Sequence, residues 1–564
     1  MANLDLNPEN RRSSFGVDVD VGSNLQLQPD TVIKQEDITS QGATDETQIA
    51  TEYPHGIRLS FVIMAVLFSV LLVSIDQTIV ATAIPKITDE FHGLGKVSWY
   101  GSAYFMTFGG FQSSWGKAFK YFSLKRTFLF AIFIFELGSL ICGVAPNPIA
   151  LIIGRAIAGI GGAGMAGGAF TIVGFSAEPK KRPLFLGLVG VTYGMSAVIG
   201  PLLGGAFTDR VSWRWCFYIN LPIGGLAAAL IIFFFRNPEA AKLVEATWKE
   251  KLLQMDFIGV ALVMSLIICF TLALQYGGQT KAWSSSEVIG LFVGFILILI
   301  TLVIWEFFQD ERAMIVPRLI KQRIIWTGAV FQLFFAGAYF ILLYYLPIYF
   351  QSIDNTSAIG SGVRNLPMVI SVSIAGLAGG AAVSVTGYAT PFSVASSALA
   401  TVGTGLLYTL DIGTSPGNWI GYQIIAGFFF SFPFMNSMNI VQANSKPEDM
   451  ASATSIVFFS QSLGGSFALA AAQSAFANTI ISTLATSAPG IDPFIVVGTG
   501  ATNIRNALTP EQVPGILVAY MQGIKTAFAV AIGFTGFSFL MSFFNTWKKL
   551  YTPGGGKKAV VAMA

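Results

Sequence analysis

The sequence predicts an all-α polytopic membrane protein with fourteen transmembrane helices. Hydrophobic residue types make up 53% of the 564-residue chain and charged types only 11%, and the mean hydropathy is +0.65. A soluble domain carries about 25% charged residues, so this chain cannot cover a water-facing surface of its size. Beyond residue 58, apolar runs of about 20 residues, the length of a helix that spans a bilayer, alternate with short polar connections. The runs are continuous, which favours helices over a barrel.

The composition also excludes several classes of protein. The net charge of +3 is small and spread along the chain, so nucleic acid is not an expected partner. Two histidines, and three cysteines that all lie in apolar runs, predict neither a metal site nor a disulfide framework. No G-x-x-x-x-G-K-[ST] string occurs, so an ATP-binding P-loop is absent from the sequence. We therefore expect no resident cofactor, and a proton gradient across the lipid bilayer as the source of energy.

The chain begins with a polar, acidic stretch over residues 1–57, which we interpret as a disordered cytosolic tail. It has no apolar run near Met1, so no cleaved signal peptide is expected. From Leu59 onward the predicted spans are 59–82, 97–116, 127–145, 148–170, 184–207, 214–235, 257–275, 287–307, 325–350, 363–386, 391–410, 418–440, 452–482 and 517–545.

The distribution of basic residues predicts the topology. With both termini in the cytoplasm, most Lys and Arg residues lie on the inner side, as the positive-inside rule requires. The outer connections hold only Lys86, Lys96, Arg210, Arg214, Lys281, Arg364 and Arg505. The one N-x-[ST] sequon begins at Asn355, in an outer connection between the ninth and tenth spans, and predicts a glycosylation site if the host is a eukaryote.

Two charged stretches divide the spans into groups of six, two and six. The first is a cytosolic linker over 237–256, which follows an N-terminal six-helix half over 58–236. Two extra helices and a basic loop occupy 257–323. A C-terminal six-helix half over 324–547 and a cytosolic tail over 548–564 complete the predicted organisation.

Charged side chains inside the spans are the candidates for proton coupling, because a charge at the bilayer centre costs roughly 2.5–3.5 kcal/mol. Asp76 can carry a proton or hold a cationic substrate, or it can be a buried group bonded to a neighbouring helix. Arg155 stays charged at any working pH and can tune a carboxyl group, or it can clamp backbone carbonyls. Glu136 is a candidate partner of Arg155. We expect Glu306, near a span end, to reach the inner surface.

The fifth span, GLVGVTYGMSAVIGPLLGGAF (187–207), predicts a moving element. Small residues allow close helix approach and proline removes a backbone hydrogen bond, so Gly200, Pro201, Gly204 and Gly205 form a candidate hinge; static tight packing is the alternative. Polar residues within spans are candidates for lining a pore, although each is also suited to a hydrogen bond between helices. They include Gln112, Asn220, Gln332, Asn436, Asn439 and Gln461.

Together these stretches resemble the Major Facilitator Superfamily, and more closely its fourteen-span drug:proton antiporters of fungal type. SIDQTIVATAIP (74–85) is similar to the first-span motif, with Asp76 at its acidic position, and Gly154-Arg155 resembles the fourth-span motif. GPLLGG (200–205) is similar to the fifth-span antiporter motif, although Ser196 replaces an earlier glycine. SWRWCFYINLPIGG (212–225) and YYLPIYFQ (344–351) resemble stretches of the fungal branch.

The resemblance implies two six-helix halves with two inserted helices, a binding site between the halves near the midplane, and alternating access. It also implies that Arg155 takes part in proton coupling. One loop departs from the family. The usual motif after the second span is G-x-x-x-D-x-x-G-[RK], but in WGKAFKYFSLKR (115–126) Lys120 stands at the aspartate position and Ser123 at the second glycine. The charge relay of that aspartate therefore does not carry over to this chain.

These observations predict a monomeric proton antiporter that exports a small organic molecule, such as a drug, toxin or secondary metabolite. We expect it in the cell membrane, with the vacuolar membrane as the alternative. A proton-coupled uptake transporter of siderophore type and a non-transporting receptor or scaffold remain open. An enzyme is not expected, because no nucleophile–base or metal-ligand constellation is present in the sequence.

Overall fold

The computed structural model describes residues 56–91, 97–238, 241, 244–493, 496 and 509–550. Within these ranges the chain consists of helices and their connections, and the one β contact there is a single bridge between Gly277 and Lys281. The all-helical prediction is confirmed. The predicted tails, 1–57 and 548–564, lie almost entirely outside the described residues.

The helices before the linker are called the N-terminal group below. α4 packs between α2 and α3, and α1 packs against α4, α5 and α7. The predicted span 214–235 is divided at Ile219, because Pro222 has no N–H with which to bond the carbonyl four residues earlier. The group consists of α1 (Gly56–Phe91), α2 (Val97–Tyr121), α3 (Leu124–Gly143), α4 (Pro148–Ser176), α5 (Arg182–Arg210), α6 (Trp215–Tyr218) and α7 (Asn220–Phe234).

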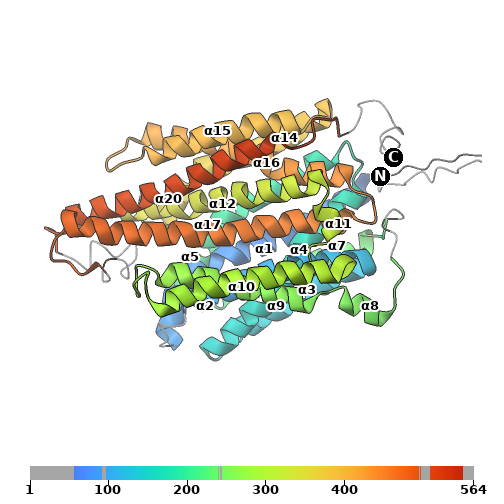
Figure 1. Ribbon diagram of the computed structural model, residues 1–564, viewed down its shortest axis with the longest axis horizontal. Coiled ribbons are helices and arrows are strands. Elements are labelled where there is room, and N and C mark those ends of the chain that lie inside the picture. Colours follow the sequence, from blue (N-terminus) through green and yellow to red (C-terminus); the bar gives the residue numbers. More distant parts are fainter. Residues whose placement is uncertain are drawn as a thin grey trace, which may run out of the picture. The chain divides into compact units, whose positions relative to one another are not determined.

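The linker and the inserted pair follow. The linker contains a short helix, α8, which begins after Thr247, whose Oγ1 accepts a hydrogen bond from the Glu250 N–H at 3.3 Å. α10 packs mainly on α9, and α9 contacts both α2 and α17; Figure 1 shows the pair on the side of the bundle opposite α15. The elements are α8 (Trp248–Leu253), α9 (Phe257–Tyr276), α10 (Ser286–Gln309), the 3₁₀ turn η2 (Asp310–Arg312) and α11 (Pro317–Ile320).

The expectation that Glu306 reaches the surface is wrong. Its side chain is only 7% exposed, and its Oε2 accepts a hydrogen bond from the backbone N–H of Ile315 at 2.9 Å. The chain folds back through η2 after α10, and this turn places Ile315 beside the carboxylate.

The helices after α11 are called the C-terminal group. α12 packs against α17 and α20, and α16 packs against α14 and α15. The two groups meet where α5 contacts α14 and where α2 contacts α17. The C-terminal group consists of α12 (Arg323–Ser352), α13 (Ala358–Arg364), α14 (Leu366–Thr386), α15 (Thr390–Tyr408), α16 (Pro416–Asn444), α17 (Met450–Ser487) and α20 (Val513–Ser542).

Twelve helical stretches in the described residues are long and apolar enough to cross a membrane. Two further predicted spans, 97–116 and 391–410, coincide with α2 and α15, which are not among the twelve. α2 buries the carboxamide of Gln112 together with hydroxyl groups, and α15 buries several hydroxyl groups, which lowers the hydropathy of both helices. Several of these hydroxyls bond within the helix, as Thr404 Oγ1 does to the Ala400 carbonyl at 2.8 Å.

Candidate functional site

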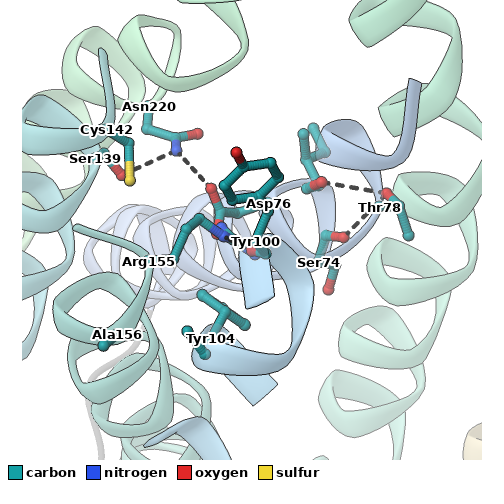
Figure 2. A network of polar contacts seen from close by, with 12 residues as sticks. Ser74, Asp76, Thr78, Tyr100, Tyr104, Ser139, Cys142, Arg155, Ala156 and Asn220 are labelled. Atoms are coloured by element: carbon teal, nitrogen blue, oxygen red, sulfur yellow. Dashed lines mark hydrogen bonds and ion pairs between the residues drawn. The ribbon is translucent and has the colours of Figure 1, made fainter. Parts of the chain in front are cut away.

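A carboxylate and a guanidinium meet inside the N-terminal group. Asp76 lies on α1 and Arg155 on α4, and Arg155 Nη1 donates to Asp76 Oδ2 in an ion pair (Figure 2). The two side chains are 0% and 1% exposed. The sequence alone leaves open whether Arg155 holds a carboxyl group or a backbone carbonyl. In the structure it does both, because its Nε also donates to the carbonyl oxygen of Tyr100 at 2.8 Å.

Three further side chains surround the ion pair. Asn220 on α7 donates from Nδ2 to Asp76 Oδ1 at 3.2 Å and to Ser139 Oγ at 3.0 Å. The Tyr104 ring lies 4.4 Å from Arg155 Cζ, within the range of a cation–π contact. Leaving one partner of such a buried pair alone costs about 3–5 kcal/mol. The pair thus links α1 to α4, and its two side chains also bond to α2 through the Tyr100 carbonyl and to α7 through Asn220.

Small residues on α4 explain how Arg155 reaches this position. The helix begins at Pro148 after Asn147, whose Oδ1 accepts a hydrogen bond from the Ala150 N–H at 2.9 Å. Past Arg155, its sequence is rich in glycine and alanine, which lets α2 and α3 approach closely. Thr107 of α2 donates from Oγ1 to the Ala156 carbonyl at 2.8 Å and fixes the register of the two helices.

Glu136, the candidate partner of Arg155, is not paired with it. Its carboxylate on α3 lies against Gly224 of α7, where an added Cβ would overlap Oε1. Both carboxylate oxygens are buried and have no hydrogen-bond partner among the described residues. Asn220 and Gly224 stand one turn apart on α7, so one face of that helix contacts both Asp76 and Glu136.

The candidate hinge lies on α5, which continues through Pro201 from Arg182 to Arg210. Gly200 allows α5 to pack closely on α1, because a Cβ there would overlap Thr78 Oγ1 and lie 3.4 Å from the Ile75 carbonyl oxygen. Gly205 has open space around the same position. The close contact between α5 and α1 thus falls two residues from Asp76.

A cavity of about 420 Å³ lies between helices of both groups and α9. Asp76 and Arg155 do not line it, but Gln77, the residue after Asp76, does. None of the described residues that line the cavity is charged. The aromatic and amide side chains in its wall are Gln77, Trp99, Phe105, Phe108, Tyr193, Gln275, Gln279, Phe340, Tyr344, Phe458, Gln461 and Gln473.

Gln461 is the member of the predicted pore-lining set that lines this cavity. Gln112 and Gln332 make the alternative hydrogen bonds between helices: Gln112 Nε2 donates to the Ala163 carbonyl at 3.2 Å, and Gln332 Nε2 to Gln461 Oε1 at 3.0 Å. The sequence set did not include Gln77, Gln275 or Gln473. Each is an amide within a predicted span or at its end, the same signal that selected Gln461.

A family model described as Major Facilitator Superfamily matches residues 66–469, more than half of the chain. The chain belongs to the Major Facilitator Superfamily. Among curated superfamily proteins, it is 61% identical to the MFS-type transporter grgE of Penicillium sp, over 91% of each chain. It is 42% identical to the MFS-type efflux pump MFS1 of Arthroderma benhamiae, over 93% of this chain and 97% of the relative. It is 40% identical to the dehydrocurvularin exporter of Aspergillus terreus, over 92% and 90%.

Solved structures share the superfamily fold at low identity. The human organic anion transporter MFSD10 matches with a TM-score of 0.54 and 13% identity, over 86% of this chain and 99% of that one. The proton:xylose symporter XylE matches with a TM-score of 0.55 and 12% identity, over 87% and 98%. At these identities the likeness concerns the fold alone.

The departure from the superfamily's usual loop motif has a structural counterpart. Lys120, at the place of the usual aspartate, forms an ion pair from Nζ to Asp449 Oδ1 at 3.1 Å. Asp449 is the residue before α17 in the C-terminal group, and Arg318 of α11 also donates to it, at 2.9 Å. Burial alone would raise the pKa of Asp449, but the hydrogen bonds from Arg318 and Lys120 outweigh it and lower that pKa.

The two groups are closed against each other at this end of the bundle. A Cβ on Gly116 of α2 would overlap Ser455 Oγ and lie 3.2 Å from the Ala451 carbonyl oxygen on α17. Gln442 Nε2 of α16 donates to the Phe170 carbonyl of α4 at 3.1 Å. The superfamily fold is thus sealed at the end that carries Lys120 and Asp449.

Proposed function

We propose that this chain is a secondary active exporter that moves a small organic molecule out of the cell while protons move in. The observation that carries the proposal is the buried Asp76–Arg155 ion pair, one residue from Gln77 in the cavity wall. When Asp76 is protonated, it loses its ionic interaction with Arg155. Because Gln77 is the next residue, this change links proton binding to the wall of the cavity. The direction of transport is supported by relatives named as an efflux pump and an exporter.

Asp76 is the group that takes up the proton. Once protonated, its carboxyl no longer carries the charge that holds Arg155. Arg155 remains a cation and keeps its contacts with the Tyr100 carbonyl and the Tyr104 ring. α1 is thereby released from α4, and Gln77 moves with α1. Release of the proton restores the ion pair and returns α1 to α4.

Glu136 and the fifth helix complete the proposed coupling. Glu136 is a second proton acceptor, joined to Asp76 through the face of α7 that carries Asn220 and Gly224. Gly200, Pro201, Gly204 and Gly205 are the hinge that lets α5 shift along α1 during the change. The close contact of Gly200 with Thr78 supports this role, because it couples α5 to the helix that carries Asp76.

The proposed topology has fourteen spans, with α2 and α15 added to the twelve apolar stretches. The six-two-six division gives an N-terminal half over 58–236 and a C-terminal half over 324–547, with the inserted helices and basic loop over 257–323. Both termini lie in the cytoplasm, so the end that carries Lys120 and Asp449 is the inner one. The monomer works in the cell membrane, or alternatively in the vacuolar membrane, and takes protons and an organic molecule as its partners.

The test is transport into inverted vesicles that contain the full-length protein, with an acidic lumen. We expect dehydrocurvularin, the compound named for a relative, to accumulate in the lumen as protons leave it, and pyranine trapped inside to report the loss of protons. Asp76→Asn should abolish the pH-dependent uptake while the protein stays in the membrane. Glu136→Gln should reduce it less, because Glu136 has no ion pair among the described residues.

The contrary outcomes are distinct. If Asp76→Asn transports with unchanged pH dependence, Asp76 is not the proton carrier. If the compound leaves the lumen together with protons, the chain is a proton-coupled uptake transporter, as the siderophore-type alternative requires. If the compound binds to the protein but does not cross the membrane, the chain is a receptor or scaffold and not a transporter.

A further inference from the structure

The inserted helix α9 is fastened to the N-terminal group along its first half. Ser114 Oγ of α2 donates to the carbonyl of Met255, two residues before α9 begins, at 2.8 Å. One turn away on α2, Gly110 leaves room for Met264, whose Cγ would lie 2.7 Å from an added Cβ. These contacts hold the start of α9 on α2.

The other end of α9 is fastened to the C-terminal group. Asn478 Nδ2 of α17 donates to the carbonyl of Gly277, directly after α9, at 3.2 Å. About two turns before Gly277 on α9, the ring of Phe270 packs on that of Phe467 of α17, with centroids 4.6 Å apart. α9 therefore bridges from α2 to α17, and it covers the cavity between them.

α9 also supplies part of the cavity wall. Ile267, Ile268, Thr271, Leu272 and Gln275 line the cavity from one side, and α17 lines it with Phe458, Gln461 and Gln473 among others. The spacing of four residues between Ile267, Thr271 and Gln275 places one face of α9 toward the cavity. A helix outside the two predicted six-helix halves thus contributes to the site.

The chemistry of the wall favours an uncharged ligand. Transfer of an ion from water into an apolar site is expensive unless an opposite charge or a set of hydrogen bonds receives it. No described lining residue is charged, and the nearby Asp76 and Arg155 neutralise each other. Aromatic faces attract cations, but the wall contains no carboxylate that would balance the charge of a cationic ligand. Carboxamides such as Gln461 and Gln275 instead suit carbonyl and hydroxyl groups of a neutral molecule, and the rings suit its flat faces.

We propose that α9 is a wall of the substrate cavity and that this cavity selects uncharged, flat aromatic molecules that carry carbonyl or hydroxyl groups, with Thr271 and Gln275 of α9 as selectivity residues. The proposal rests on the transport function above, because it names the substrate class of that cavity. It does not depend on proton coupling, since binding at equilibrium needs no gradient.

The test uses a pair of probes with one ring skeleton. N-methylacridone is neutral and carries a carbonyl group, whereas N-methylacridinium is a permanent cation. Binding of each to the purified full-length protein in nanodiscs is measured by equilibrium dialysis without a pH gradient. We expect N-methylacridone to bind at least about tenfold more tightly than N-methylacridinium. Equal binding, tighter binding of the cation, or no binding of the neutral probe overturns the proposed substrate class, while Asp76→Asn flux still tests export separately.

Substitutions on α9 test its place in the wall. Gln275→Glu should reverse the preference by adding a carboxylate to the cavity, so that N-methylacridinium becomes the tighter probe. Gln309→Glu, which adds the same charge to α10 outside the cavity lining, is the matched control and should leave the preference unchanged.

Thr271→Val should weaken N-methylacridone binding several-fold. Ser265→Ala, which removes a hydroxyl group on α9 that does not line the cavity, should leave this binding unchanged. If Gln275→Glu and Gln309→Glu behave alike, α9 is not a wall of the site.

Discussion

Lys120 on α2 and Asp449 directly before α17 form an ion pair between the two helical groups, with Lys120 Nζ 3.1 Å from Asp449 Oδ1. In the superfamily's usual loop motif, an aspartate stands at the position of Lys120. The basic residue at this position is matched by an acid on the opposite group. The ion pair thus joins α2 to the start of α17, across the two groups, at the position where the motif has an aspartate.

Removal of this pair should favour opening of the sealed end. We expect Lys120→Met to shift the opening equilibrium by about 1 kcal/mol, roughly fivefold, because Arg318 still holds Asp449. The measurement is the rate at which a methanethiosulfonate labels Ser455→Cys, a position buried between α2 and α17. Lys125→Met is the control, since Lys125 Nζ contacts the Ile232 carbonyl within the N-terminal group. Equal labelling in both variants would exclude a sealing role for Lys120.

The same seal should resist acid. Because the pKa of Asp449 is lowered in the closed structure, its stabilising contribution is fully present above the ordinary carboxyl pKa and disappears as the pH falls through the lowered value. We therefore expect the labelling rate of Ser455→Cys, corrected for thiol ionisation, to be constant between pH 7 and pH 5. A rise within this interval would mean that another group controls the seal.

Gly200 should tolerate no side chain beside Thr78. We expect Gly200→Ala to destabilise the protein by about 1–3 kcal/mol, because the new methyl group overlaps Thr78 Oγ1. Gly205→Ala, with open space at the equivalent atom, should leave the melting temperature unchanged or slightly raised. Thermal unfolding in detergent measures both. Thr78→Ala should partly rescue Gly200→Ala, and no rescue would show that the overlap is not the cause.

Arg155 should not be replaceable by lysine. A lysine keeps the charge opposite Asp76, but it lacks the second nitrogen that reaches the Tyr100 carbonyl and the planar group that lies on the Tyr104 ring. We expect Arg155→Lys to fold and to lose about tenfold or more in transport rate, which corresponds to roughly 1.4 kcal/mol. Arg155→Met should lower the amount of folded protein, because it leaves Asp76 buried without its ionic partner. If Arg155→Lys transports at the wild-type rate, the positive charge is the only property of Arg155 that transport requires.

Asn355 should carry a glycan when the protein is made in a eukaryotic host. It is exposed, has a left-handed backbone with φ of 52°, and lies in the connection between α12 and α13. We expect Asn355→Gln to abolish a mobility shift that peptide-N-glycosidase removes from the wild-type protein. A wild-type protein that reaches the cell surface without this shift would contradict the site.

The helices could be predicted from the sequence because a continuous apolar run has few ways to satisfy its backbone in hydrocarbon. The run predicted over 363–386 forms α14 with nearly the same ends. The number of spans was harder to establish, since α2 buries a carboxamide and hydroxyl groups and α15 buries hydroxyl groups, which make both helices less apolar. Glu306 was misplaced because a local charge pattern does not reveal that the chain folds back over it.

The site residues could be selected from the sequence, but their partners could not. Asp76 and Glu136 are both acids within apolar runs, and only the packing of α1, α4 and α7 decides that Arg155 pairs with Asp76. Lys120 and Asp449 are 329 positions apart, so no local pattern relates them. The cavity wall formed by α9 was missed for the same reason, because a span count says nothing about which neighbours an extra helix adopts.

α9 has one further consequence for the transport cycle. Its start is hydrogen-bonded to Ser114 on one group and its far end to Asn478 on the other. Alternating access requires these groups to rotate relative to each other. A rigid helix that is hydrogen-bonded to both groups cannot move with both. We therefore expect each turnover to lengthen or break one of the two hydrogen bonds, and their relative strengths to decide which group α9 moves with.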